Sequence, residues 1–206
     1  MKKIAIFASG AGSNAQKIIE YFASPQTPLL AERGEERGEM HSRIKIALIV
    51  CNKPGAGVIQ IAEEEGISLL LIEKERFFRG DGYLPQLLEA GTDLIVLAGF
   101  LWKIPQTLIN SFPKKIINIH PALLPKYGGK GMYGASVHQA VIDAKEKESG
   151  ITIHYVDEHY DNGDVILQVK CKVLPDDNAE TLAQRIHQLE HKHYSEAIEK
   201  LLLEAT

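Results

Sequence analysis

The 206-residue sequence has little of several features that would each indicate a special class of protein. Its two cysteines, Cys51 and Cys171, are too few for the disulfide framework of a small secreted domain. Both lie in apolar runs, so we expect buried thiols and a reducing, cytoplasmic location. No apolar run approaches the length of a membrane span, and the one after Lys3 is too short for the core of a signal peptide.

The sequence also lacks a strong charge of either sign. A formal net charge of −4 gives no general attraction to nucleic acid or anionic lipid, so we expect neither as a partner. Any anionic ligand must then be held by local backbone dipoles or by single cations. The hydrophobic content of 45% is typical of one globular domain over residues 1–206. Residues 24–43, which are polar and repeat Glu-Arg-Gly-Glu, are the exception, and we predict a mobile surface insertion there.

What the sequence does contain is a regular alternation of short apolar runs and helical patterns. Strands are expected at 4–8, 44–51, 68–72, 94–98, 116–119, 150–156 and 165–173. Helices are expected at 15–22, 54–65, 83–90, 136–144 and 178–203, and a charged loop at 73–81. The alternation predicts a Rossmann-like three-layer α/β fold, with a mostly parallel sheet and an antiparallel C-terminal part.

A glycine-rich turn, Gly10 to Asn14, joins the first strand to the first helix. Helix-start amides and glycines that allow close approach are typical of a phosphate site, although Ser13 or Asn14 could serve only as the helix cap. The turn also matches the short dinucleotide fingerprint, which needs an acidic residue after the second strand. The second strand ends instead in Cys51-Asn52-Lys53-Pro54, so a single phosphate is the favoured ligand.

The segment from Lys115 to Tyr127 is the most informative part of the chain. Asn118 and His120 are two residues apart, so on a strand both side chains leave the same face. Pro121 cannot donate to a sheet ladder, so the strand stops there. An amide and an imidazole therefore lie at the carboxyl end of a strand, where open α/β sheets bind their ligands.

Two further features leave their interpretation open. The loop at 99–104 carries apolar groups that could stack on a flat ligand or fold back onto the core. His187 to His191 formally matches the zinc motif H-x-x-E-H, but no later helix supplies a third ligand. We therefore expect no metal, and a polar helix face with Glu190 and His191 available to a ligand.

Together these motifs resemble the glycinamide ribonucleotide formyltransferase family. The matching segments follow the family's order and are 8–14, 52–53, 96–100, 118–127, 161–163, 165–168 and 188–191. The Asn-Ile-His-Pro segment is shared by the wider formyl-transfer superfamily, whereas the Gly-Ser-Asn turn is typical of the ribonucleotide enzyme. The resemblance covers nearly the whole chain.

The resemblance implies transfer of a formyl group from 10-formyltetrahydrofolate to the amine of 5'-phosphoribosylglycinamide in de novo purine biosynthesis. Asn118 would donate to the developing oxyanion, and His120 would act as acid or hydrogen-bond donor to the same oxygen. Asp161 would orient or charge His120 and help to remove the amine proton. From the residues alone Asp161 is an ordinary loop carboxylate, and Asp164 is a nearby alternative.

The family also implies the residues that bind the two substrates. The ribonucleotide would be held by Gly12, Ser13, Asn14, Ala15, Gln16 and Glu190. The folate would be held by Arg79, Leu101, Trp102, Lys103, Ile104, Asn118, Asp157, Glu158, His159, Tyr160 and Asp161. Relatives often have Met-Arg-Ile-Leu at 101–104, so pterin contacts are expected to differ in detail. Spacing does not separate Arg76 from Arg79 as the contact to the folate tail, and Arg79 is preferred.

Three alternatives remain. A formyltetrahydrofolate hydrolase uses the same three residues on water but carries an extra N-terminal domain, whereas the first strand here is expected at Ile4. A methionyl-tRNA formyltransferase carries an extra C-terminal RNA-binding domain, and this chain is expected to end at its helix. A catalytically silent binding module is disfavoured by the intact Asn118, His120 and Asp161. Monomer and homodimer are both open.

Overall fold

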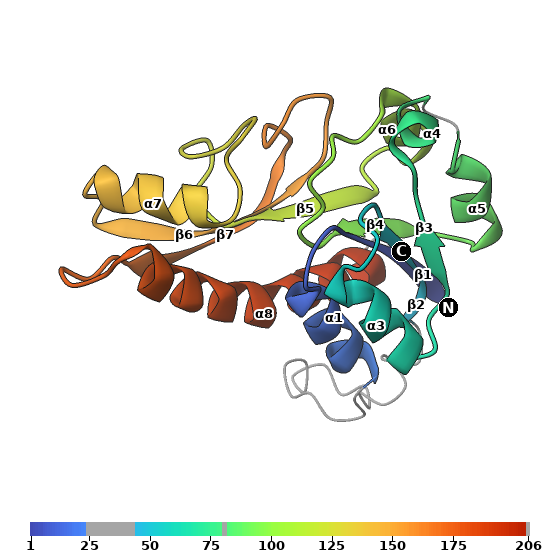
Figure 1. Ribbon diagram of the computed structural model, residues 1–206, viewed down its shortest axis with the longest axis horizontal. Coiled ribbons are helices and arrows are strands. Elements are labelled where there is room, and N and C mark those ends of the chain that lie inside the picture. Colours follow the sequence, from blue (N-terminus) through green and yellow to red (C-terminus); the bar gives the residue numbers. More distant parts are fainter. Residues whose placement is uncertain (24–43, 80–81, 205–206) are drawn as a thin grey trace. The chain divides into compact units, whose positions relative to one another are not determined.

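The computed structural model describes residues 1–23, 44–79 and 82–204, and it has two compact units (Figure 1). The first unit comprises the described residues of Met1–Phe100 together with the end of the chain from Glu199. The second unit is Leu101–Ile198. The insertion predicted at 24–43 lies outside the described residues.

The first unit is built on a parallel sheet with the strand order β3-β2-β1-β4. Its strands are β1 (Lys2–Ala8), β2 (Ile44–Cys51), β3 (Leu69–Leu71) and β4 (Leu94–Leu97). All four confirm strands predicted from apolar runs. Every residue of β4 is buried, as expected for a strand covered on both faces.

The helices of the first unit agree with the sequence pattern except at two places. They are α1 (Ser13–Ala23), α3 (Gly57–Glu64), α4 (Lys74–Phe78) and α5 (Leu84–Glu89). The helix predicted from Pro54 begins at Gly57, and the charged loop predicted at 73–81 contains α4. Phe77 explains the second error, because its ring is buried and packs edge-to-face on Phe100 with centroids 5.8 Å apart. Core packing of one aromatic side chain outweighs the charged surroundings.

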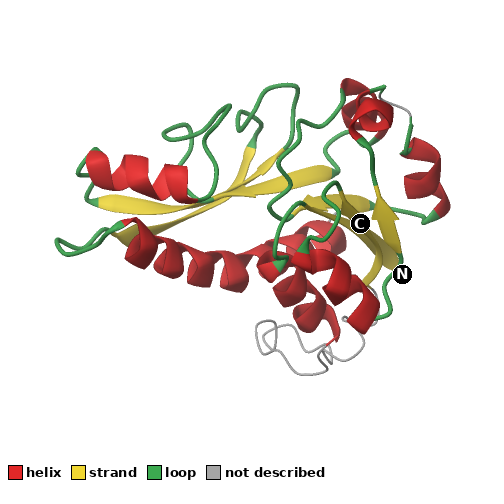
Figure 2. Ribbon diagram, viewed as in Figure 1, coloured by secondary structure: helices red, strands yellow, loops and turns green. Residues whose placement is uncertain are grey.

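The second unit contains antiparallel strands, with β6 pairing to β5 on one side and β7 on the other. Its elements are α6 (Gln106–Ser111), β5 (Ile116–His120), α7 (Ala135–Asp143), β6 (Glu148–Tyr155), β7 (Val165–Lys172) and most of α8 (Ala179–Glu204). In Figure 2, α7 lies on one side of the β6 and β7 strands and α8 on the other. Parallel strands early in the chain and antiparallel strands late confirm the predicted fold class, and α6 was not predicted.

Both thiols are free, but they differ in burial. Cys51 is buried as predicted, whereas Cys171 is only half-buried, because it lies on β7, where every position is half-buried or exposed. Among the described residues, no helix is both long and apolar enough to cross a membrane.

Candidate active site

Strand β5 positions the two side chains that the sequence singled out. The strand ends at His120, immediately before Pro121, as expected. His120 is almost fully buried, and Asn118 is half-buried. In the antiparallel ladder with β6, Asn118 lies opposite His154 and His120 lies opposite Thr152. The site therefore rests on two neighbouring strands of one unit.

Asp161 is the carboxylate that joins these side chains. It lies in the loop between β6 and β7, and its side chain is only 11% exposed. One carboxylate oxygen, Oδ2, lies 3.6 Å from Nδ1 of His120, and the other, Oδ1, lies 3.7 Å from Nε2 of His154. The alternative carboxylate, Asp164, is exposed and pairs with Lys114 at 3.2 Å. Asp161 is therefore the residue that the fold brings to His120.

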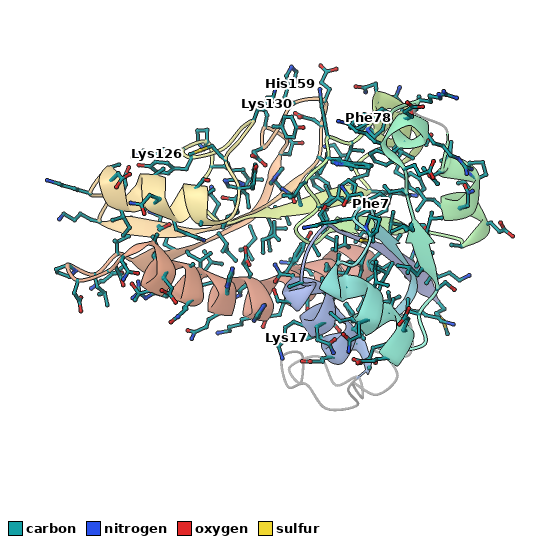
Figure 3. The ribbon with its side chains drawn as sticks, in the orientation of Figure 1. Phe7, Lys17, Phe78, Lys126, Lys130 and His159 are labelled. Atoms are coloured by element: carbon teal, nitrogen blue, oxygen red, sulfur yellow. The ribbon has the colours of Figure 1, made fainter. Side chains whose placement is uncertain are left out.

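The glycine-rich loop after β5 holds both partners of this pair. The Gly129 amide donates to Oδ2 of Asp161 at 2.8 Å, and Nε2 of His120 lies 2.8 Å from the carbonyl oxygen of Tyr127. A Cβ at Gly128 would lie 2.5 Å from Cδ2 of Leu124 and 3.2 Å from the Cβ of Asp161, so a larger residue there would have to displace both neighbours. Figure 3 shows Lys130 and His159, which belong to the two loops, on the same side of the strands.

The Tyr127 contact also identifies the reactive nitrogen of His120. A carbonyl oxygen can only accept a hydrogen bond, so Nε2 of His120 carries a proton and donates it. Nδ1, which faces Asp161, is then the nitrogen that can gain or lose a proton. An amide donor, a histidine that can exchange a proton and a carboxylate therefore converge in a nearly buried place. This is a set suited to acyl transfer.

His154 belongs to this cluster and was missed as a site residue. Its ring is buried, and Nε2 lies 3.2 Å from Nδ2 of Asn118. Side chains alternate along a strand, so His154 shares a face of β6 with Thr152, and two polar side chains on one face of that strand were the available signal. Only the register of β5 against β6 reveals that it faces Asn118.

The predicted phosphate turn has the backbone that such a site needs. Gly12 has a φ of 83°, and a Cβ there would lie 2.9 Å from the Cβ of Val58, so only glycine fits. The Gln16 amide bonds to the carbonyl of Gly12, which starts α1. Ser13 is exposed, whereas the side chain of Ala15 is fully buried, so Ala15 can offer a ligand only its backbone. The side chain of Gln16 bonds to Glu65.

The C-terminal helix departs at Glu190 from the polar face predicted for 187–191, where His187 and Gln188 are exposed and His191 is half-buried. Glu190 is 6% exposed, because it lies one helical turn before the buried Tyr194 on the same face of α8. The rings of His187 and His191 stack with centroids 6.3 Å apart. Within the described part of the chain, no group of three or more His, Cys, Asp or Glu side chains is arranged to hold a metal ion.

The predicted folate residues vary in exposure. Arg79 is 77% exposed and its only ion pair among the described residues, at 3.9 Å, is with Glu75, whereas Arg76 donates to the Gly82 carbonyl and lies over the Tyr83 ring. In the segment 101–104, Leu101 and Lys103 are exposed, Trp102 is half-buried and Ile104 is buried. The first part of that segment is therefore open to a ligand, and Ile104 packs into the core.

The loop at 157–160 is ordered by its first residue. Asp157 accepts hydrogen bonds from the backbone of His159 and from the side chain of Asn162. Glu158, His159 and Tyr160 are exposed. This loop can therefore present polar and aromatic groups while leading directly to Asp161.

Comparison with known proteins assigns this fold to one family. The family model described as formyl transferase matches residues 2–198, and the chain belongs to that family. A phosphoribosylglycinamide formyltransferase of Bacillus subtilis is 38% identical over 98% of this chain and 95% of the relative. The crystal structure of the enzyme of that name from Bacillus halodurans superposes with a TM-score of 0.83 at 33% identity, covering 100% of this chain and 97% of that one.

Plant relatives are similar over most of this chain but are longer. The phosphoribosylglycinamide formyltransferase of Arabidopsis thaliana, named as chloroplastic, is 40% identical over 96% of this chain. The chain spans 64% of that relative and 61% of a second one from Vigna unguiculata.

Proposed function

We propose that the protein transfers the formyl group of 10-formyltetrahydrofolate to the amine of 5'-phosphoribosylglycinamide. The products are 5'-phosphoribosyl-N-formylglycinamide and tetrahydrofolate, in de novo purine biosynthesis. The observation that carries this proposal is the convergence of Asn118, His120 and Asp161 in one unit, with Oδ2 of Asp161 3.6 Å from the His120 ring. Two proteins named phosphoribosylglycinamide formyltransferase, which match this chain nearly end to end, support the proposal.

The proposed chemistry is attack of the amine on the formyl carbon. Asn118 donates to the oxygen of the tetrahedral intermediate, a contribution of about 10²–10³ in rate at comparable sites. His120 stabilises the same oxygen by donating a hydrogen bond or proton. Asp161 orients His120 and accepts, through water, the proton that the amine loses, and the leaving nitrogen of the folate takes up a proton as the carbon–nitrogen bond breaks.

The ribonucleotide phosphate is assigned to the turn at Gly12, Ser13 and Asn14, together with Ala15 and Gln16 at the start of α1. The positive φ of Gly12 and the exposure of Ser13 support this assignment. The rest of the ribonucleotide is assigned to Glu190.

The folate is assigned to Arg79, to the segment 101–104 and to the loop at 157–161. The 77% exposure of the Arg79 side chain supports its choice over Arg76, whose guanidinium is already bound to Gly82 and Tyr83.

We further propose a cytoplasmic location, which the two free thiols favour. Either a monomer or a homodimer would be compatible with a catalytic set that lies in one chain. Sedimentation of the purified protein would decide between them.

The experiment that tests the function measures tetrahydrofolate release with and without 5'-phosphoribosylglycinamide. We expect release only when the amine is present, with one formylated product for each folate. Equal release without the amine would instead indicate a hydrolase acting on water. Binding of both ligands without turnover would indicate a binding module, and either result would overturn the proposal.

A further inference from the structure

His154 contributes a second histidine to the site, and the chemistry proposed above does not use it. It lies on β6 directly opposite Asn118, just as Thr152 lies opposite His120. Thr152 is structural, because its hydroxyl donates to the Ala122 carbonyl and accepts from the Leu124 amide. His154 instead reaches into the site, where its Nε2 approaches both Asn118 and Asp161.

The backbone fixes which nitrogen of His154 carries the proton. Nδ1 lies 2.8 Å from the carbonyl oxygen of Tyr155, which can only accept a hydrogen bond. Nδ1 is therefore the protonated nitrogen, and in the neutral ring Nε2 carries a lone pair. The group of Asn118 that faces Nε2 at 3.2 Å must then be its NH₂, which is a donor.

Burial keeps this ring neutral. The His154 side chain is 2% exposed, and burial lowers its pKa from the ordinary value of 6.5, against the opposing effects of the Tyr155 carbonyl and the Asp161 carboxylate. Nε2 also lies 3.7 Å from Asp161, which is too long for a hydrogen bond. Within this cluster, the contact with Asn118 is therefore the one hydrogen bond of Nε2.

We propose that His154 is a positioning residue that sets the orientation of the Asn118 carboxamide, and this inference rests on the proposed function. One hydrogen of the Asn118 NH₂ is held by Nε2 of His154. The second hydrogen is left to point at the oxygen of the tetrahedral intermediate. Without the acceptor on His154, the carboxamide can rotate by 180° and present its own oxygen to the developing negative charge.

This assignment has a measurable consequence for turnover. Loss of one donor to an oxyanion lowers kcat by about 10²–10³. His154→Leu is therefore expected to lower kcat by about 10² while leaving both KM values within about twofold, because the ring does not itself bind substrate. His154→Gln supplies an amide oxygen where Nε2 stood, and it is expected to recover at least about tenfold of that loss.

The decisive measurement is a double-mutant cycle with Asn118→Ala. If His154 acts through Asn118, the double variant His154→Leu, Asn118→Ala has the same kcat as Asn118→Ala alone. Effects that multiply, or a Gln variant that folds but is no better than Leu, would overturn the proposal. His193→Gln, which removes a histidine of α8 that pairs with Glu196, is the control and should keep the wild-type kcat.

A second readout does not depend on activity. Nitrogen-15 spectra of the histidine rings should show His154 with a protonated Nδ1 and an unprotonated Nε2. One side-chain NH₂ proton of Asn118 should move when His154 is replaced by Leu. A ring protonated at Nε2 would defeat the inference even if the wild type transfers formyl groups. Failure of formyl transfer by the wild type would contradict the proposed function, while these spectra would still test the contact.

Discussion

The two units of this protein offer a candidate ligand different groups, backbone amides in the first and side chains in the second. In the first, the turn at Gly12 offers backbone amides at the start of α1, and its shape depends on one glycine with a φ of 83°. In the second, side chains from β5, β6 and the following loop converge, and backbone groups hold His120, His154 and Asp161 in place. A backbone site is thus encoded locally, whereas a side-chain site depends on strand register. Substitutions in the first should weaken binding, and those in the second should slow the chemistry.

The largest effect is expected from Asp161→Asn. The amide can still accept the hydrogen bond from Gly129, so the fold should survive. It cannot accept the amine proton or charge His120, so kcat should fall by about 10²–10⁴. Initial rates at saturating concentrations of both substrates would measure this.

The matched control for that variant is Asp164→Asn. Asp164 is exposed and pairs only with Lys114 among the described side chains, so its variant should retain normal kcat. A larger loss in Asp164→Asn than in Asp161→Asn would reverse the assignment of the carboxylate.

Gly12→Ala should weaken binding of the ribonucleotide to the first unit and leave the chemistry of the second unit unchanged. The added Cβ meets Val58 at 2.9 Å and forces a strained φ, which costs about 1–3 kcal/mol of stability. The KM for the ribonucleotide should rise by at least about tenfold because the turn shifts, while the pH profile of kcat stays unchanged.

Gly55→Ala is the control for backbone strain alone. Gly55 also has a positive φ, 75°, but a Cβ there meets nothing within 4 Å. It should lose stability without a rise in KM. An equal rise in KM in both variants would show that strain, and not the phosphate turn, is responsible.

Arg185→Ala should lower stability without touching either site. Its guanidinium binds both carboxylate oxygens of Asp177, at 2.6 and 3.0 Å, next to the start of α8. Loss of this charged pair should cost about 1–3 kcal/mol at neutral pH, measured by urea unfolding. Because the bond to Arg185 lowers the pKa of Asp177 from its ordinary value of 3.8, the stabilisation is present above that value and is lost as the pH falls below it.

The difference between wild type and Arg185→Ala should therefore shrink in acid. If the difference in unfolding free energy stays constant down to the lowest pH at which both proteins are folded, the charge of Asp177 is not its source. Formyl transfer by the folded variant should remain normal.

The smallest effect is expected from Arg79→Ala. An exposed arginine contributes about 0.2–1 kcal/mol, so the KM for the folate should rise by about 1.5–5-fold. Arg76→Ala should instead lower the thermal midpoint, because it removes the contacts with Gly82 and the Tyr83 ring. If Arg76→Ala instead raised the KM for the folate and Arg79→Ala did not, the folate contact would belong to Arg76.

Most of the elements could be predicted from sequence because their signals are local. Apolar runs fixed the strands of both units, and the spacing of Ile18, Ile19 and Phe22 fixed the buried face of α1. The exceptions have tertiary causes. Helix α4 forms around the buried Phe77 in a segment whose sequence predicts a charged loop. Glu190 is buried on a helix face whose sequence predicts a polar surface.

For the candidate site, the sequence by itself determined that Asn118 and His120 share one face at the end of a strand, since side chains alternate along any strand. It also determined a turn at Gly12 that suits a phosphate. Only the tertiary structure decided that Asp161 and not Asp164 lies beside His120, and that His154 faces Asn118. The reason is physical: those contacts depend on the pairing of β5 with β6 and on a loop held by Gly129, and neither leaves a local trace in the sequence.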